Sequence, residues 1–188
     1  MSAVTVSWAD DHLKRYAKQI NELNLRFPKV LPRIVNQVGN RAKTQVIRSL
    51  TKQTGLQRRV IVDAVEVTMA GGKRFSYDMV TRGGNIRLKY LNPKETEAGV
   101  VAKPFGKSTL YPGAFLKGGA FPDRKTVDKF NGHAFYRLNR SGTKITYARS
   151  GVFIPTEMTR GATKAAFERT AAPLLQERVE KVLVKLLK

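Results

Sequence analysis

Hydrophobic residues at helical spacing mark the first third of the chain. In residues 8–24, and again in residues 30–50, apolar side chains recur at every third or fourth position, which predicts two amphipathic helices. Pro28 and Pro32 fall between the two stretches, and we place them in the lead-in and first turn of the second helix, where a missing amide hydrogen costs little. Gly55 is the expected end of that helix.

The middle of the chain changes to short apolar runs that are broken by glycine and proline. This pattern is typical of antiparallel strands joined by turns. The runs expected to form strands are 64–70, 74–81, 86–91, two within 98–116, 132–138 and 151–155. Residues 117–132 contain glycine and mixed charge without periodicity, which predicts a surface loop with high mobility.

The last part of the chain returns to helical spacing. Thr156 is the expected N-cap of a helix over residues 157–187, and Pro173 should kink this helix or divide it. We therefore predict an α+β protein in which a central antiparallel sheet is flanked by N-terminal helices and a long C-terminal helix that is kinked near Pro173.

The length of 188 residues is that of one ordinary domain. We expect a single domain over 1–188, with helices in 8–54, the sheet in 65–155 and the C-terminal helix in 157–187.

Positive charge is far in excess of what a small soluble domain needs. The chain has 35 Lys and Arg against 14 Asp and Glu, a formal net charge of +21. Such a surface repels itself and attracts polyanions. From Asn24 to Val62 there is no acidic residue, whereas an ordinary solvated helix face mixes both signs. The candidate contact residues in this stretch are Arg33, Arg41, Lys43, Arg48, Arg58 and Arg59.

A second cationic stretch lies in residues 133–158, which run as a strand, a basic loop and a returning strand. No carboxylate occurs in it before Glu157. We expect this hairpin to present one cationic tip, formed by Arg137, Arg140, Lys144 and Arg149. Two anions fit such a tip equally well: the phosphates of DNA, or an acidic neighbouring protein.

The sequence shows no constellation that supports catalysis or metal binding. Cysteine is absent, and the only histidines, His12 and His133, are far apart in the sequence. Two carboxylate pairs come closest to a magnesium site, Asp63 with Glu66 and Glu95 with Glu97. The first pair borders a predicted strand start and the second lies in a predicted loop, so neither fits a nuclease centre. We expect no enzyme activity, no metal and no cofactor.

The sequence also indicates where the protein is made. The first residues lack a basic leader followed by an apolar core, and no apolar run approaches the length of a membrane span. We expect a protein that is soluble in a cytoplasm and has no membrane partner.

The order of several segments resembles the prophage minor tail protein Z family of long-tailed bacteriophages. The segments are "NRAKTQVIRSLTKQTGLQRRVI" (40–61), "YPGAFL" (111–116), "GHAFYRLNRSG" (132–142) and "ARSGVFIPTEM" (148–158) before an alanine- and leucine-rich helix. The resemblance covers about the second quarter and the last part of the chain, and residues 64–107 lie outside it.

The resemblance implies a structural virion protein that completes the tail where it meets the head. It implies assembly as a homo-oligomeric ring around the DNA channel, for which a hexamer is one candidate, in contact with tail terminator and head-completion (neck) proteins. Such a protein is assembled in the host bacterial cytoplasm, ends in the tail-neck region of the virion and can contact packaged DNA non-specifically. The alternative is a non-specific nucleic-acid-binding protein, because the same charge would serve that function.

Overall fold

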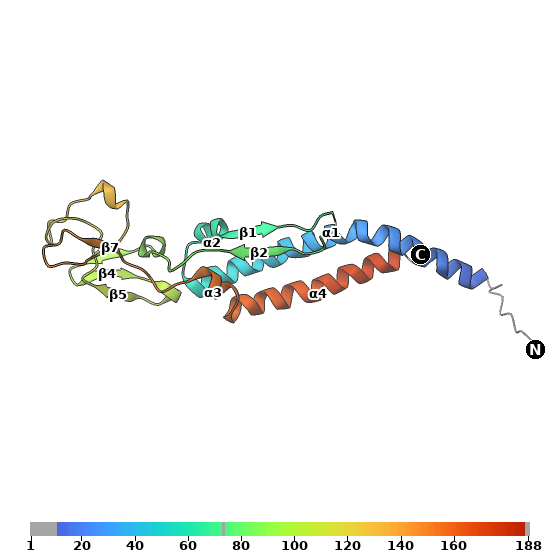
Figure 1. Cartoon of the computed structure of the whole chain (residues 1–188). Helices are drawn as coiled ribbons and strands as arrows, with labels where there is room; N and C mark the ends of the chain where they lie inside the picture. Colours follow the sequence, from blue (N-terminus) through green and yellow to red (C-terminus); the bar gives the residue numbers. More distant parts are fainter. Residues whose placement is uncertain (1–10, 73, 187–188) are drawn as a thin grey trace, which may run out of the picture. The chain divides into compact units, whose positions relative to one another are not determined.

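The computed structural model describes residues 11–72 and 74–186, and Figure 1 shows its elements along the chain. The helices are α1 (Asp11–Thr54), α2 (Arg58–Ala64), α3 (Ile154–Met158) and α4 (Gly161–Leu186), with short 3-10 helices η1 (Leu88–Leu91), η2 (Pro104–Gly106) and η3 (Asp128–Phe130). The strands are β1 (Val65–Thr68), β2 (Asp78–Thr81), β3 (Lys94–Thr96), β4 (Gly99–Ala102), β5 (Thr109–Pro112), β6 (Phe135–Arg137) and β7 (Ile145–Tyr147). Long helices at both ends with antiparallel strands between them confirm the α+β class. None of the described helices is both long and apolar enough to cross a lipid bilayer.

The strands are divided among three small antiparallel sheets, where the sequence predicted one central sheet. The sheets are β1–β2, β3–β4–β5 and β6–β7. A single bridge between Phe115 and Phe135 links the chain just after β5 to the start of β6. The strands are only three or four residues long, so each pairs over a short distance before a turn redirects the chain.

Helix α1 is continuous across the boundary that the sequence predicted between two helices. Pro28 and Pro32 lie inside it. The proline ring holds φ at about −65°, which is a helical value, so each proline loses a hydrogen bond and crowds the preceding turn without leaving the helical conformation. The predicted end is confirmed: Gly55 has a φ of 75°, which stops the helix after Thr54. Of the predicted first helix, residues 8–10 lie outside the described residues.

The C-terminal helix begins earlier than predicted and is interrupted in a different place. Helix α3 starts with Ile154, so Thr156 lies inside it instead of capping it. Helix α4 then runs through Pro173 as one element. The interruption lies before Gly161, where a φ of 59° takes the backbone out of the right-handed helix.

Three further predictions for the middle of the chain are wrong. Residues 86–91 form η1 over most of their length, because Leu88 and Leu91, one 3-10 turn apart, are both buried. Glu95 lies in β3 and not in a loop. Residues 151–155 are not a strand, since Ile154 already belongs to α3.

The chain forms two compact units, and α1 and α4 contribute to both. Of the described residues, the first unit contains 11–41, 68–78 and 171–186, and the second contains 42–67 and 79–170. In the first unit, Arg178 of α4 donates a hydrogen bond of 2.9 Å to the side-chain oxygen of Gln37 in α1. These two helices therefore pack against each other in that unit (Figure 1).

The first unit also holds the connection between β1 and β2 against α1. The side-chain amide of Asn36 exchanges hydrogen bonds of 2.8 and 2.9 Å with the main chain of Ala70. The hydroxyl of Tyr77 donates to the side chain of Asn40 at 2.9 Å, and its ring lies over Gly39, where the helix has no side chain.

The second unit contains the main hydrophobic core. Its buried members come from α1, α2, β1, η1, β4, α3 and the segments that flank these elements, β5 and the β6–β7 hairpin, and they include Ile47, Leu50, Leu56, Ile61, Leu88, Val100, Ala134, Ala148, Val152 and Ile154. Burial of aliphatic side chains is the main favourable term that holds such a unit together.

Candidate interaction surface

The turn of the β6–β7 hairpin is built by one asparagine. The amide nitrogen of Asn139 donates to the hydroxyls of Ser141 and Thr143, each at 2.7 Å. Its side-chain oxygen accepts a hydrogen bond of 2.9 Å from the main-chain N–H of Lys144. Asparagine favours turns because its side chain can replace main-chain partners in this way. A hairpin is therefore present in this stretch, but its returning strand is β7 and not the predicted 151–155.

Arg140 and Lys144 are the candidate cations that lie in this turn. Both side chains are exposed, and within the described part of the chain neither has a hydrogen-bond or ion-pair partner. The sequence has no Asp or Glu between Asp128 and Glu157, so no nearby carboxylate along the chain offsets their charge. These two charges remain free to meet an external anion.

Of the other two hairpin candidates, Arg137 lies beside Gly142 of the turn, whereas Arg149 lies at the far end of the hairpin, so the four do not form a single tip. The guanidinium carbon of Arg137 lies 5.3 Å from the centre of the Phe115 ring, an attractive cation–π arrangement. Arg149 follows β7 at the opposite end of the hairpin and donates a hydrogen bond of 3.1 Å to the main-chain oxygen of Asn85. The hairpin register separates Arg149 from the other three, because Arg149 lies beyond Tyr147, which pairs with Phe135 at the end farthest from the turn.

The candidates of the first helices are distributed over both units. Arg33 and Arg41 belong to the first unit, and the others belong to the second. All of these side chains are exposed except Lys43, which is half-buried. Arg59 lies 4.0 Å from Asp63, an ion pair that contributes little because both side chains are largely exposed.

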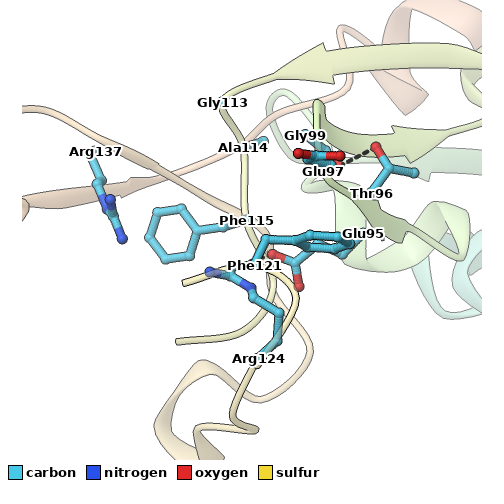
Figure 2. Close-up of a pocket in the computed structure, with 10 residues that line it drawn as sticks. All are labelled: Glu95, Thr96, Glu97, Gly99, Gly113, Ala114, Phe115, Phe121, Arg124 and Arg137. Atoms are coloured by element: carbon cyan, nitrogen blue, oxygen red, sulfur yellow. Dashed lines mark hydrogen bonds and ion pairs between the residues drawn. The ribbon is translucent and has the colours of Figure 1, made fainter. Parts of the chain in front are cut away.

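A pocket of about 170 Å³ lies beside β3 and contains the most buried ion pair of the described chain (Figure 2). Arg124 contacts the carboxylate of Glu95 there, and their side chains are 13% and 10% exposed. Arg124 also donates to the main-chain oxygens of Lys117 and Gly119. Its guanidinium therefore ties the predicted surface loop 117–132 both to itself and to the three-stranded sheet.

The ion pair in this pocket holds the loop. The charge of Glu95 is neutralised by Arg124, with which it forms a charge-assisted hydrogen bond. Glu97 lines the same pocket but is exposed. Among residues 11–72 and 74–186, no group of three or more His, Asp or Glu lies together in a way that could hold a metal ion.

His133 belongs to an aromatic cluster. Its ring packs edge-on against Tyr147, at 5.0 Å between centres, and against Tyr90 at 6.5 Å. Burial, together with the charges of Lys89 and Arg87, lowers the pKa of His133 below its usual value, so the imidazole is neutral at pH 7. The side chain of His12 lies outside the part that the structure describes.

Sequence reasoning missed the polar contacts that connect distant segments. Gln53 bonds both Glu157 and Thr163, and Arg124 bonds Glu95. Nothing local marks these side chains, because their partners lie far away in the sequence.

Comparison of the chain with family models, with characterised proteins and with solved structures finds no match.

Proposed function

We propose that this chain is a structural protein of a long-tailed bacteriophage, a tail completion protein that assembles as a ring around the DNA channel where the tail meets the head. The proposal rests on the ordered segments that resemble the minor tail protein Z family. It also rests on the distribution of charge over a folded α+β scaffold.

The observation that carries the proposal is the exposure of the candidate cations. Arg48, Arg58, Arg140 and Lys144 are exposed on helices and on a turn of the second unit, on a chain with 35 basic and 14 acidic residues. Charge of this kind contacts the phosphates of any DNA sequence, because phosphate contacts position a protein without reading bases. A conduit for a whole genome requires such sequence-independent contact.

The polar contacts of the described residues agree with a structural role. Within the described residues the one buried carboxylate–guanidinium pair holds a loop, and no clustered metal ligands occur. The proposed partners are further copies of the chain, the tail terminator and the head-completion proteins, and the proposed location is the tail-neck region of the virion.

The decisive experiment is deletion and complementation in a phage that carries the gene. We expect deletion to give full-length tails and filled heads that do not join, and we expect the protein in stoichiometric amounts in intact particles. Joined, infective particles without the protein would refute the proposal.

A binding experiment separates the proposal from the alternative of a monomeric nucleic-acid-binding protein. Sedimentation should find a closed oligomer. If the turn cations meet DNA, replacing Arg140 and Lys144 by Gln should lower the slope of log K against log salt for arbitrary duplex DNA by about 2. A monomer that binds duplex DNA tightly would favour the alternative.

A further inference from the structure

Strand β7 has one edge that is paired with β6 and one that is open. On β6, the main-chain N–H and C=O of Phe135 exchange hydrogen bonds of 2.9 Å with Phe115, so they point away from β7. Phe135 faces Tyr147 across the hairpin. Antiparallel pairs alternate between bonded and non-bonded positions, so the main-chain groups of Tyr147 must point away from β6 as well.

The main-chain N–H and C=O of Ile145 also point away from β6, because Ile145 lies two residues before Tyr147. The bonded positions on either side confirm this register: Ala148 donates to Ala134 and Leu138 donates to Lys144, each at 2.8 Å. The outer edge of β7 therefore presents the N–H and C=O of both Ile145 and Tyr147.

The segment 86–88 pairs with the continuation of β7 on the β6 side and not on the outer edge, because Ala148 also donates to Ala134 and Ser150 lies two residues further on. Leu88 donates a hydrogen bond of 3.2 Å to the main-chain oxygen of Ala148, and Ser150 donates one of 2.8 Å to Ile86. This segment therefore leaves the outer edge of β7 uncovered. In the described part of the chain no hydrogen bond reaches the main chain of Ile145 or Tyr147, and their residues are 38% and 36% exposed.

Cations surround this open edge. Lys144 and Arg149 flank it in the sequence, and the guanidinium of Arg87 lies 3.8 Å from the centre of the Tyr147 ring. Arg137 is paired with Ile145 across the hairpin. An unpaired edge that is ringed by positive charge is protected against pairing with copies of itself.

The positive charge around the open edge of β7 determines which kind of partner can bind there. A second copy that added its own β7 in antiparallel register would place Lys144 near Arg149 of the other copy, and like charges across paired strands are destabilising. Duplex DNA offers acceptors to the N–H groups but no regular donors to the C=O groups. An extended peptide supplies both, and acidic side chains on it would complement the cations.

We propose that the outer edge of β7, at Ile145 and Tyr147, binds an extended acidic segment of another protein by strand addition. This inference goes beyond the proposed function, because it depends on the edge and its charges and holds whether or not the chain works in a phage tail.

Amide hydrogen exchange of the isotope-labelled full-length protein tests the proposal. The probe is a synthetic peptide of alternating Glu and Thr, and its control is the same peptide with every second amide N-methylated. We expect the amides of Ile145 and Tyr147 to exchange at least about tenfold more slowly with the first peptide and unchanged with the second. Equal effects of both peptides, or no protection by either, would overturn the proposal.

Two sets of variants separate the edge from simple charge attraction. Ile145→Pro removes an outward N–H without removing a bond to β6, and it should weaken binding of the Glu-Thr peptide about tenfold. Lys144→Gln with Arg149→Gln should weaken it at low salt, whereas the exposed pair Lys103→Gln with Lys107→Gln should not. If Ile145→Pro does not fold, the exchange measurement on the natural chain still decides.

The same exchange measurement with duplex DNA of arbitrary sequence tests whether the edge binds nucleic acid instead. If DNA slows exchange at Ile145 and Tyr147 and the Glu-Thr peptide does not, the edge serves nucleic acid and the proposal is wrong.

Discussion

The side-chain oxygen of Gln53 accepts hydrogen bonds from both the main-chain N–H and the hydroxyl of Thr163, at 3.0 and 2.9 Å, across 110 residues of sequence. Its amide nitrogen donates to the carboxylate of Glu157 at 2.7 Å and to the main-chain oxygen of Glu157 at 3.1 Å. Thr163 and Glu157 are 0% and 3% exposed. One amide thus satisfies the buried polar groups that join the end of α1 to α3 and the start of α4.

Gln53→Ala should lower the free energy of unfolding by about 3 kcal/mol, because it leaves buried donors and a buried carboxylate without partners. Urea-induced unfolding measures the change. Gln45→Ala, at an exposed position of the same helix, is the control and should change it by less than about 0.5 kcal/mol. A similar change in the unfolding free energy for both substitutions would show that the Gln53 contacts do not contribute specifically to stability.

Acid should destabilise the protein through Glu157. Burial alone would raise the pKa of this carboxyl, but hydrogen bonds from Arg160 and Gln53 and the charge of Arg160 outweigh burial and lower it. The unfolded chain, with a carboxyl pKa of about 4.3, then takes up the proton at higher pH than the folded chain. The stability that Glu157 contributes is therefore present above that value and is lost as the pH falls through the folded pKa.

Glu157→Gln should flatten the dependence of the unfolding free energy on pH below about pH 5, because the variant has no proton to take up. Urea titrations at a series of pH values provide the measurement. Glu168→Gln, an exposed position in α4, should leave the profile as it is. An unchanged profile for Glu157→Gln would mean that this carboxyl has the same pKa in both states.

Glu95→Ala should release the loop that Arg124 holds. Removing one member of a mostly buried ion pair leaves the other charge without a partner, which costs about 3 kcal/mol. We expect trypsin to cleave the variant faster after Lys117 and Arg124 than it cleaves the natural chain. Glu97→Ala, at the exposed neighbour that lines the same pocket, should have no such effect; faster cleavage there too would point to a general loosening of the sheet.

Gly39→Ala should destabilise the protein, although replacing glycine by alanine inside a helix normally stabilises it by about 1 kcal/mol. A Cβ at Gly39 would lie 2.2 Å from Cγ of Tyr77, so the ring would have to move. We expect a net loss of about 1–2 kcal/mol in thermal or urea unfolding. In the background of Tyr77→Ala the same substitution should become stabilising, and a double-mutant cycle measures this coupling.

Local signals determined much of the architecture. The spacing of apolar residues predicted the α+β class and the two helical ends, and Gly55 marked the end of α1 because positive φ is a property of that residue itself. The first strand and the basic turn of the hairpin around Asn139 were also predictable, since the turn contacts lie within a few residues, whereas the returning strand was expected too late in the chain. Pro28 led to a wrong prediction because a local signal was followed there too. Proline inside a helix removes a hydrogen bond and usually marks a helix boundary, but here the long helix α1 continues through it.

The sequence by itself also determined the excess of positive charge, which follows from composition and needs no fold. The tertiary structure alone decided which cations remain free, because Arg137 lies over Phe115 and Arg149 bonds Asn85, while Arg140 and Lys144 have no partner in the described part of the chain. It alone decided that β7 keeps an open edge, because β6 and residues 86–88 both pair on the same side of this stretch of chain. Contacts of this kind join residues far apart in the chain, and no periodicity of neighbouring residues encodes them.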